Sequence, residues 1–183
     1  MMQTRPGRPT WIEIDGGAIA NNVRLLRRRL HHGSRLMAVV KANGYGHGAV
    51  TVAQVALAAG ADQCAVASLA EAIELRQQGV QAPILVLGYT GPWQAAEALH
   101  HHVTLTIVDM QSAQSFAEAA AHAGAHLPIH VKVNTGMNRL GVSLEEAPAF
   151  IAALHALPAL HVEGIFSHFA TSGEMDKSYA QLQ

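Results

Sequence analysis

The chain has 183 residues, of which 50% are hydrophobic and 14% carry a formal charge, and its formal net charge is -1. This composition is typical of a globular protein with one sizeable core, and the scattered basic residues argue against nucleic-acid or membrane-surface binding. A single cysteine, Cys64, excludes an internal disulfide and fits a cytoplasmic protein. We expect neither a signal peptide nor a membrane span, because no apolar run reaches about 18 residues.

Short β-rich runs alternate with longer stretches of helical period, which indicates parallel α/β structure. An extended segment at 11–15 is followed by a helix expected over 18–30, whose arginines Arg24 and Arg27 to Arg29 should face water. Strands are expected at 36–41, 64–67, 84–87, 103–108, 129–134 and 162–167. Further helices are expected at 49–59, 69–78, 93–100, 111–123 and 145–156. Gly60, Gly79 and Gly124 stand where helices should stop.

Repeated βα units fit either a doubly wound sheet or a (β/α)8 barrel of the TIM type. The turn after the first apolar strand lacks the G-x-G-x-x-G spacing of a dinucleotide fold, so the barrel is preferred. A barrel places its active site at the carboxyl ends of its strands, where Lys41, Leu87, Asn134 and His168 fall. Closure needs eight strands and about six can be counted, so we expect an incomplete barrel.

Lys41 stands at the end of a buried strand, in the glycine-rich run Ala38 to Gly48. A lysine in such a place either reaches past the strand end to water or, because desolvation lowers its pKa, serves as a Schiff-base amine. Arg139 follows a glycine-bearing turn and could bind a carboxylate or merely be solvated. The alternation in 129–134 places His130, Lys132 and Asn134 on one face of a strand.

Two further candidates are ambiguous from the residues alone. His168 could be an ordinary core histidine, and Leu87 could belong to the core or line a pocket. We expect no metal site, because the three histidines at 100–102 point in different directions and lack a cluster of other ligands.

Three motifs together, 38–48, 132–141 and 167–170, resemble the N-terminal part of the alanine racemases, over nearly the whole chain. The resemblance implies pyridoxal 5'-phosphate (PLP) as cofactor. It also implies that 16–183 form most of a PLP-binding barrel, that 1–15 belong to a β-rich C-terminal domain, and that the rest of that domain is absent from this sequence.

The resemblance assigns roles to individual residues. Lys41 would hold PLP covalently and act as a catalytic acid or base. Tyr45 would bind the phosphate, and Arg139 would bind the cofactor phenolate and the substrate carboxylate. His168 and Leu87 would line the cofactor. The resemblance also makes Lys132 a candidate for carbamylation, and Asn134 stands where many relatives carry aspartate.

The expected function is therefore PLP-dependent interconversion of L-alanine and D-alanine, for peptidoglycan or alanine catabolism, by a homodimer. The alternatives are a serine or broad-specificity racemase and a PLP-binding barrel protein without catalysis. The family's second catalytic base, a tyrosine from the partner subunit, is not in this sequence, so residues 1–183 alone should be inactive.

Overall fold

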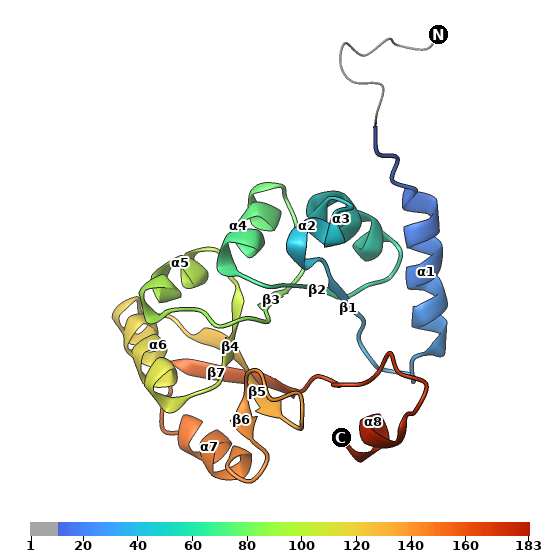
Figure 1. The fold of residues 1–183 in the computed structure, drawn as a ribbon. Coiled ribbons are helices and arrows are strands. Elements are labelled where there is room, and N and C mark those ends of the chain that lie inside the picture. Colours follow the sequence, from blue (N-terminus) through green and yellow to red (C-terminus); the bar gives the residue numbers. More distant parts are fainter. Residues whose placement is uncertain (1–10) are drawn as a thin grey trace.

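The computed structural model of the protein describes residues 11–183, and its strands form one parallel sheet (Figure 1). The strands are β1 (Met37–Val39), β2 (Gln63–Val66), β3 (Ile84–Val86), β4 (Thr104–Ile107), β5 (Leu127–Asn134), β6 (Val142–Ser143) and β7 (Leu160–Phe166). All six expected strands are present. Only β6, which is two residues long and pairs with the end of β5, was not expected.

The order of the strands decides between the two folds considered from the sequence. Each strand from β1 to β5 pairs with the next along the chain, and β5 pairs on its other side with β7. A doubly wound sheet reverses its order at a switch point, whereas a barrel does not. The fold is therefore that of a β/α barrel, with about six of the eight units of a closed one.

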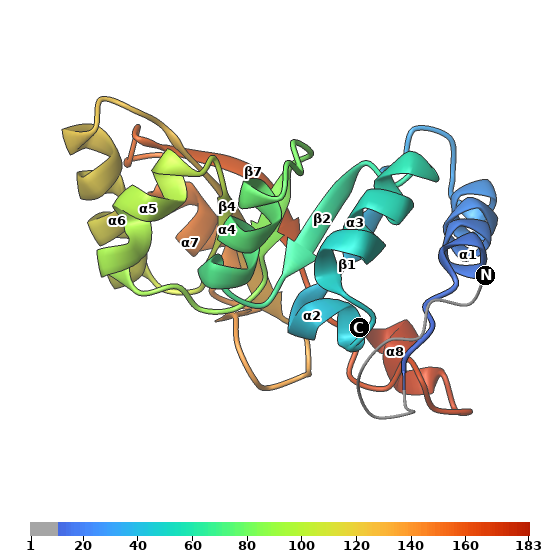
Figure 2. The ribbon, with the colours of Figure 1, turned by 90° about the horizontal axis from the view of Figure 1, so that it is seen from above.

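The helices are α1 (Gly16–Arg29), α2 (Lys41–Tyr45), α3 (Ala49–Ala58), α4 (Leu69–Gln77), α5 (Ala95–His100), α6 (Met110–His122), α7 (Ala147–Leu154) and α8 (Ser178–Leu182). All except the short α2 and α8 lie outside the curved sheet, as Figures 1 and 2 show. A 3-10 turn (Pro92–Gln94) precedes α5, where one continuous helix was expected. The short helices α2 and α8 were not expected. Gly60, Gly79 and Gly124 all have positive φ after helix ends, as predicted.

The two faces of the sheet differ in character along β5. Ile129 and Val131 are fully buried in the core beneath the helices. Because side chains alternate along a strand, His130 and Lys132 point to the opposite, concave face, which confirms the predicted shared face. The concave face therefore carries polar groups where the helix-covered face carries apolar ones.

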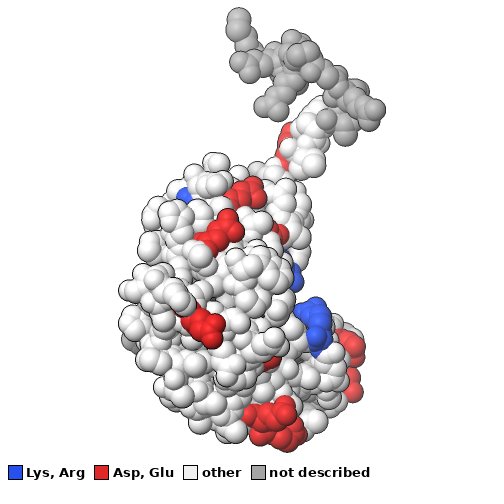
Figure 3. Space-filling model, turned by 90° about the vertical axis from the view of Figure 1, so that its left-hand side faces the viewer, with Lys and Arg blue, Asp and Glu red and all other residues white. Residues whose placement is uncertain are grey.

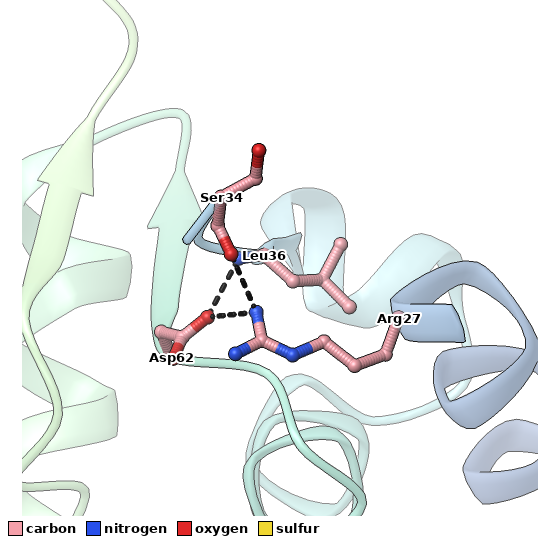
Figure 4. Close-up of polar contacts among 4 residues, drawn as sticks. All are labelled: Arg27, Ser34, Leu36 and Asp62. Atoms are coloured by element: carbon pink, nitrogen blue, oxygen red, sulfur yellow. Dashed lines mark hydrogen bonds and ion pairs between the residues drawn. The ribbon is translucent and has the colours of Figure 1, made fainter. Parts of the chain in front are cut away.

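Helix α1 is tied to the sheet by a polar contact that the sequence reading missed. Arg27 donates to a carboxylate oxygen of Asp62 at 2.8 Å and to the carbonyl oxygen of Ser34 at 2.9 Å (Figure 4). The same Asp62 oxygen accepts from the backbone N–H of Leu36 at 2.7 Å. The arginines of the run are all exposed, as expected, and Arg27 makes this contact in addition.

The surface shows isolated charges. On the face drawn in Figure 3, acidic side chains form separate patches and no continuous basic stripe crosses it. Within residues 11–183, no helix is both long and apolar enough to span a membrane. Trp11 and Ile12, in the segment predicted to belong to another domain, are 68% and 81% exposed and form no regular secondary structure.

Candidate active site

Lys41 lies just after β1 and begins a turn whose backbone is left-handed. The next four residues, Ala42, Asn43, Gly44 and Tyr45, have φ values of 52°, 53°, 61° and 55°, so the backbone turns left-handed. Only one of the four is glycine, and left-handed geometry costs about 1–2 kcal/mol for each other residue. The sequence predicts a glycine-rich turn here, but it indicates neither the left-handed conformation of the backbone nor its strain.

Hydrogen bonds from both sides of the turn hold this geometry. The N–H of Gly44 donates to the carbonyl oxygen of Val40 at 2.8 Å, and Asn43 Oδ1 accepts from the N–H that begins α3 at 3.0 Å. The ring Nδ1 of His47 lies 3.1 Å from the carbonyl oxygens of Gly44 and Tyr45. These contacts give His47 a structural role in the turn. Strain that is maintained in this way is typical of functional sites.

The Tyr45 side chain is 60% exposed and therefore accessible to a ligand. Leu87 lies directly after β3, at the same edge of the sheet as Lys41, and is half-buried. Its backbone N–H donates to the carbonyl oxygen of Val66, which fixes the start of the loop that follows.

Lys132 is the most enclosed of the predicted site residues, with 5% of its surface exposed. Its ammonium nitrogen lies 5.0 Å from the ring centroid of Phe166 on β7, a cation–π distance. Among residues 11–183, neither Lys132 nor Lys41 nor Arg139 forms an ion pair with a carboxylate.

Asn134 organises the loop that carries Arg139. Its Oδ1 accepts from the N–H groups of Gly136 and Asn138, at 3.1 and 2.9 Å, and its Nδ2 donates to Asn138 Oδ1 at 2.9 Å. The loop then returns against the end of β5 at Gly141, where an added Cβ would lie 2.8 Å from the Asn134 nitrogen. Only glycine fits there, because its φ is also +133°.

A second set of contacts links this loop to the one after β7. Thr135 Oγ1 and Ser167 Oγ lie 2.6 Å apart, and Gln183 beyond α8 donates to the carbonyl oxygen of Thr135. Ser167 directly precedes His168. The loops that carry Arg139 and His168 are therefore connected by hydrogen bonds. No sequence motif predicted this connection.

The electrostatics show that four of the predicted residues come together. Burial lowers the pKa of Lys132, and the positive charges of Arg139 and Lys41 lower it further. The pKa of His168, an exposed side chain, is lowered by slight burial and by the same three cations. Residues from the carboxyl ends of β1, β5 and β7 thus form one cationic cluster that suits an anionic ligand.

A cavity of about 740 Å³ lies elsewhere. Residues at the amino ends of the strands line it, among them Gln63, Ile84, Thr104 and His161. Barrel enzymes carry their chemistry at the other end, so the cationic cluster is the candidate active site. Among the described residues, no group of three or more His, Cys, Asp or Glu side chains could hold a metal.

Comparison with known proteins agrees with this architecture. The family model described as alanine racemase, N-terminal domain, matches residues 14–183. The chain is 50% identical over 176 residues to an alanine racemase of Desulforamulus reducens, covering 96% of this chain and 48% of that protein. It is 46% identical to alanine racemase 2 of Oceanobacillus iheyensis, covering 96% and 45%. The chain thus spans about half the length of the curated relatives it matches.

Solved structures give the same result. The alanine racemase of Bacillus anthracis with bound L-Ala-P superimposes with a TM-score of 0.89 at 37% identity, covering 98% of this chain and 46% of that one. A histidine racemase from Leuconostoc mesenteroides superimposes with a TM-score of 0.85 at 33% identity, covering 91% and 45%. Sequence, fold and the placement of the motifs agree, and the chain belongs to the alanine racemase family.

Proposed function

We propose that the protein containing this chain is a PLP-dependent alanine racemase that interconverts L-alanine and D-alanine, for peptidoglycan synthesis or alanine catabolism. The observation that carries the proposal is the convergence of Lys41, Lys132, Arg139 and His168 at one edge of the barrel. The family relationship supports it. The cytoplasmic location stays a prediction from the sequence.

The residues present fit PLP. The cofactor offers an aldehyde, a phosphate and a phenolate, and the substrate adds a carboxylate. The site offers one strand-end amine on Lys41, a guanidinium on Arg139 and an exposed phenol on Tyr45, with no carboxylate paired to the cations within 11–183. Such a set of donors holds anions and excludes a cationic ligand.

Two residues carry the reaction in this proposal. When bound, PLP draws electrons from the amino-acid Cα and so makes its proton easier to remove. The Lys41 amine anchors the cofactor and then takes or returns the Cα proton on one face. Arg139 orients the substrate carboxylate through paired hydrogen bonds. The base for the other face lies outside residues 1–183, on the partner subunit of a homodimer.

Three residues shape the cofactor pocket. Tyr45 would donate to the phosphate from the left-handed turn, and Leu87 would line the pocket after β3. His168 would contribute its imidazole to the wall of the pocket. Its pKa is lowered by slight burial and by the neighbouring cations, which favours the neutral imidazole.

Lys132 is the proposed carbamylated lysine. A cation that is 5% exposed and lies among other cations is unfavourable, and its lowered pKa increases the fraction of neutral amine. The ammonium group loses one proton to become the neutral amine, and the amine then adds to carbon dioxide and releases a second proton, so that a cation becomes an anion. The resulting carbamate would face Arg139 and hold its guanidinium in place. A carbamyl ¹³C signal from labelled bicarbonate, absent in Lys132→Ala, would support this assignment.

Substrate choice is the open part of the proposal. The histidine racemase of Leuconostoc mesenteroides shares this fold at 33% identity, so the fold does not fix the substrate. Serine or broad specificity therefore remains the alternative. The third reading, a PLP-binding barrel without catalysis, predicts cofactor binding and no exchange of the Cα proton.

The test is Cα proton exchange in heavy water, followed by NMR, with PLP and the complete protein that contains this chain. We expect exchange and racemisation of alanine, slower reaction with serine and histidine, and negligible turnover by residues 1–183 alone. Equal or faster turnover of serine or histidine would support the alternative specificity. PLP binding without exchange of any amino acid would refute a racemase.

A further inference from the structure

One carboxylate bridges the turn after Lys41 to the neighbouring strand. Glu71 Oε1 accepts from the backbone N–H of Ala42 at 2.7 Å. Its other oxygen, Oε2, accepts from the N–H groups of Ala67 at 2.7 Å and Ser68 at 3.3 Å. Ala67 directly follows β2, and β2 is the parallel partner of β1. The carboxylate thus joins the carboxyl ends of two adjacent strands.

This arrangement exceeds what helix capping requires. Glu71 is the third residue of α4, and with Ser68 it forms a capping box in which each side chain accepts from the other's backbone N–H. A capping box needs one carboxylate oxygen. The second oxygen reaches Ala42, 29 positions earlier in the chain, which has no role in α4.

The accepted N–H belongs to the peptide unit that joins Lys41 to Ala42. Its direction sets the ψ angle of Lys41, and therefore where the lysine side chain leaves the backbone. It is also the first peptide of the left-handed turn, in which Ala42, Asn43 and Tyr45 each carry a conformational cost. A charged acceptor gives a stronger hydrogen bond than a neutral one and can offset part of this cost. Glu71 forms no ion pair with the Lys41 ammonium group, so it acts through the backbone.

We propose that Glu71 is a positioning residue for Lys41, one that holds the strained turn so that Lys41 and Tyr45 meet the same cofactor. This inference rests on the proposed function, because it presumes that Lys41 binds PLP. Glu71 contacts neither substrate nor cofactor in this account. It fixes the first peptide of the left-handed turn.

Three variants of the complete protein separate this role from helix capping. Glu71→Gln keeps the size but offers one acceptor oxygen, so it can serve the Ala42 N–H or the Ala67 loop and not both. Glu71→Ala removes both bridges. The matched control, Ser68→Ala, removes the cap hydroxyl of the same helix, which accepts from the Glu71 N–H at 3.4 Å, and leaves the Ala42 contact intact.

Two readouts are measured well below the unfolding temperature, with far-UV circular dichroism to confirm folding. The first is hydrogen–deuterium exchange of the 40–45 peptide without cofactor, which should accelerate in both Glu71 variants and stay unchanged in Ser68→Ala. The second is the apparent Kd for PLP. It should rise by about tenfold to a hundredfold in Glu71→Ala, because one charged hydrogen bond is lost, and less in Glu71→Gln.

The outcomes are distinguishable. Unchanged exchange in both Glu71 variants would show that the carboxylate does not hold the turn, and faster exchange with unchanged PLP affinity would refute the positioning role. A Ser68→Ala variant as impaired as Glu71→Ala would reduce Glu71 to a helix cap. If Glu71→Ala does not fold, Glu71→Gln carries both readouts. Wild-type protein that binds no PLP at Lys41 would instead refute the proposed function, and this inference with it.

Discussion

Cationic side chains lie at both ends of the sheet, and they differ in what they bind. At the amino end, Arg76 donates to four backbone carbonyl oxygens, those of Val80, Ala82, His101 and His102, at 2.7 to 3.0 Å. At the carboxyl end, the three cations of the cluster form no ion pair within residues 11–183. An arginine whose donors are satisfied by the chain is a structural residue. Cations left without such partners, around a strained turn, are available to a ligand.

Substitution of Arg139 should give the largest effect of the three that follow, a loss of catalytic activity. Arg139→Lys keeps the charge and loses the paired geometry that a carboxylate prefers. Losing one or two charge-assisted hydrogen bonds, at about 1.5–3 kcal/mol each, lowers kcat/KM for L-alanine by one to several decades in the full chain. Thermal stability should barely change. A normal kcat/KM would mean that this cation has no ligand role, and the comparison between the two ends would fail.

Substitution of Arg76 should have the opposite profile. Arg76→Met keeps much of the side-chain volume and leaves four carbonyl oxygens without their donor, so we expect the free energy of unfolding to fall by about 3 kcal/mol. Urea denaturation measures it, with the exposed Arg28→Met as a control that should stay within about 0.5 kcal/mol of wild type. PLP affinity under native conditions should not change. A loss of PLP affinity in folded Arg76→Met would contradict the division of roles.

The smallest effect concerns two histidines at the two ends. Burial lowers the pKa of both His130 and His168 below 6.5, but only His168 is also affected by Lys132, Arg139 and Lys41. An anion bound at the cluster would offset these charges, so inorganic phosphate should raise the pKa of His168 and leave that of His130 unchanged. NMR titration with His130→Gln and His168→Gln for assignment measures both. Equal shifts, or none at His168, would argue against an anion site.

Much of the fold followed from the sequence, because it depends on periodicity. Strand and helix positions came from the alternation of apolar residues, and the barrel followed from a turn that lacks the dinucleotide spacing. The two-residue β6 was too short to show any period. The left-handed conformation of the turn at Ala42 and Asn43 is stabilised by contacts with neighbouring residues and with Glu71, and Ala42 gives no sign of it in the sequence.

The site was predictable as a set of residues and not as a structure. Lys41, Lys132, Arg139 and His168 stood out because they lie at or after strands in motifs shared with the family. Asn134 was placed at a strand end, but its role in ordering the Arg139 loop depends on hydrogen bonds that only the fold reveals. Glu71 could be read at most as a helix cap. The contact of its second oxygen with Ala42 could not be predicted, because it depends on β1 and β2 lying side by side.

The central claim is that Lys41 binds the cofactor. The complete protein is incubated with PLP and reduced with borohydride. It is then digested with trypsin, and the peptides are analysed by mass spectrometry, with Lys41→Ala as the control. We predict one reduced pyridoxyl adduct, on the peptide that contains Lys41, and none in Lys41→Ala. An adduct on Lys132 or Lys177 in place of Lys41, or no adduct in a folded protein, would contradict the account.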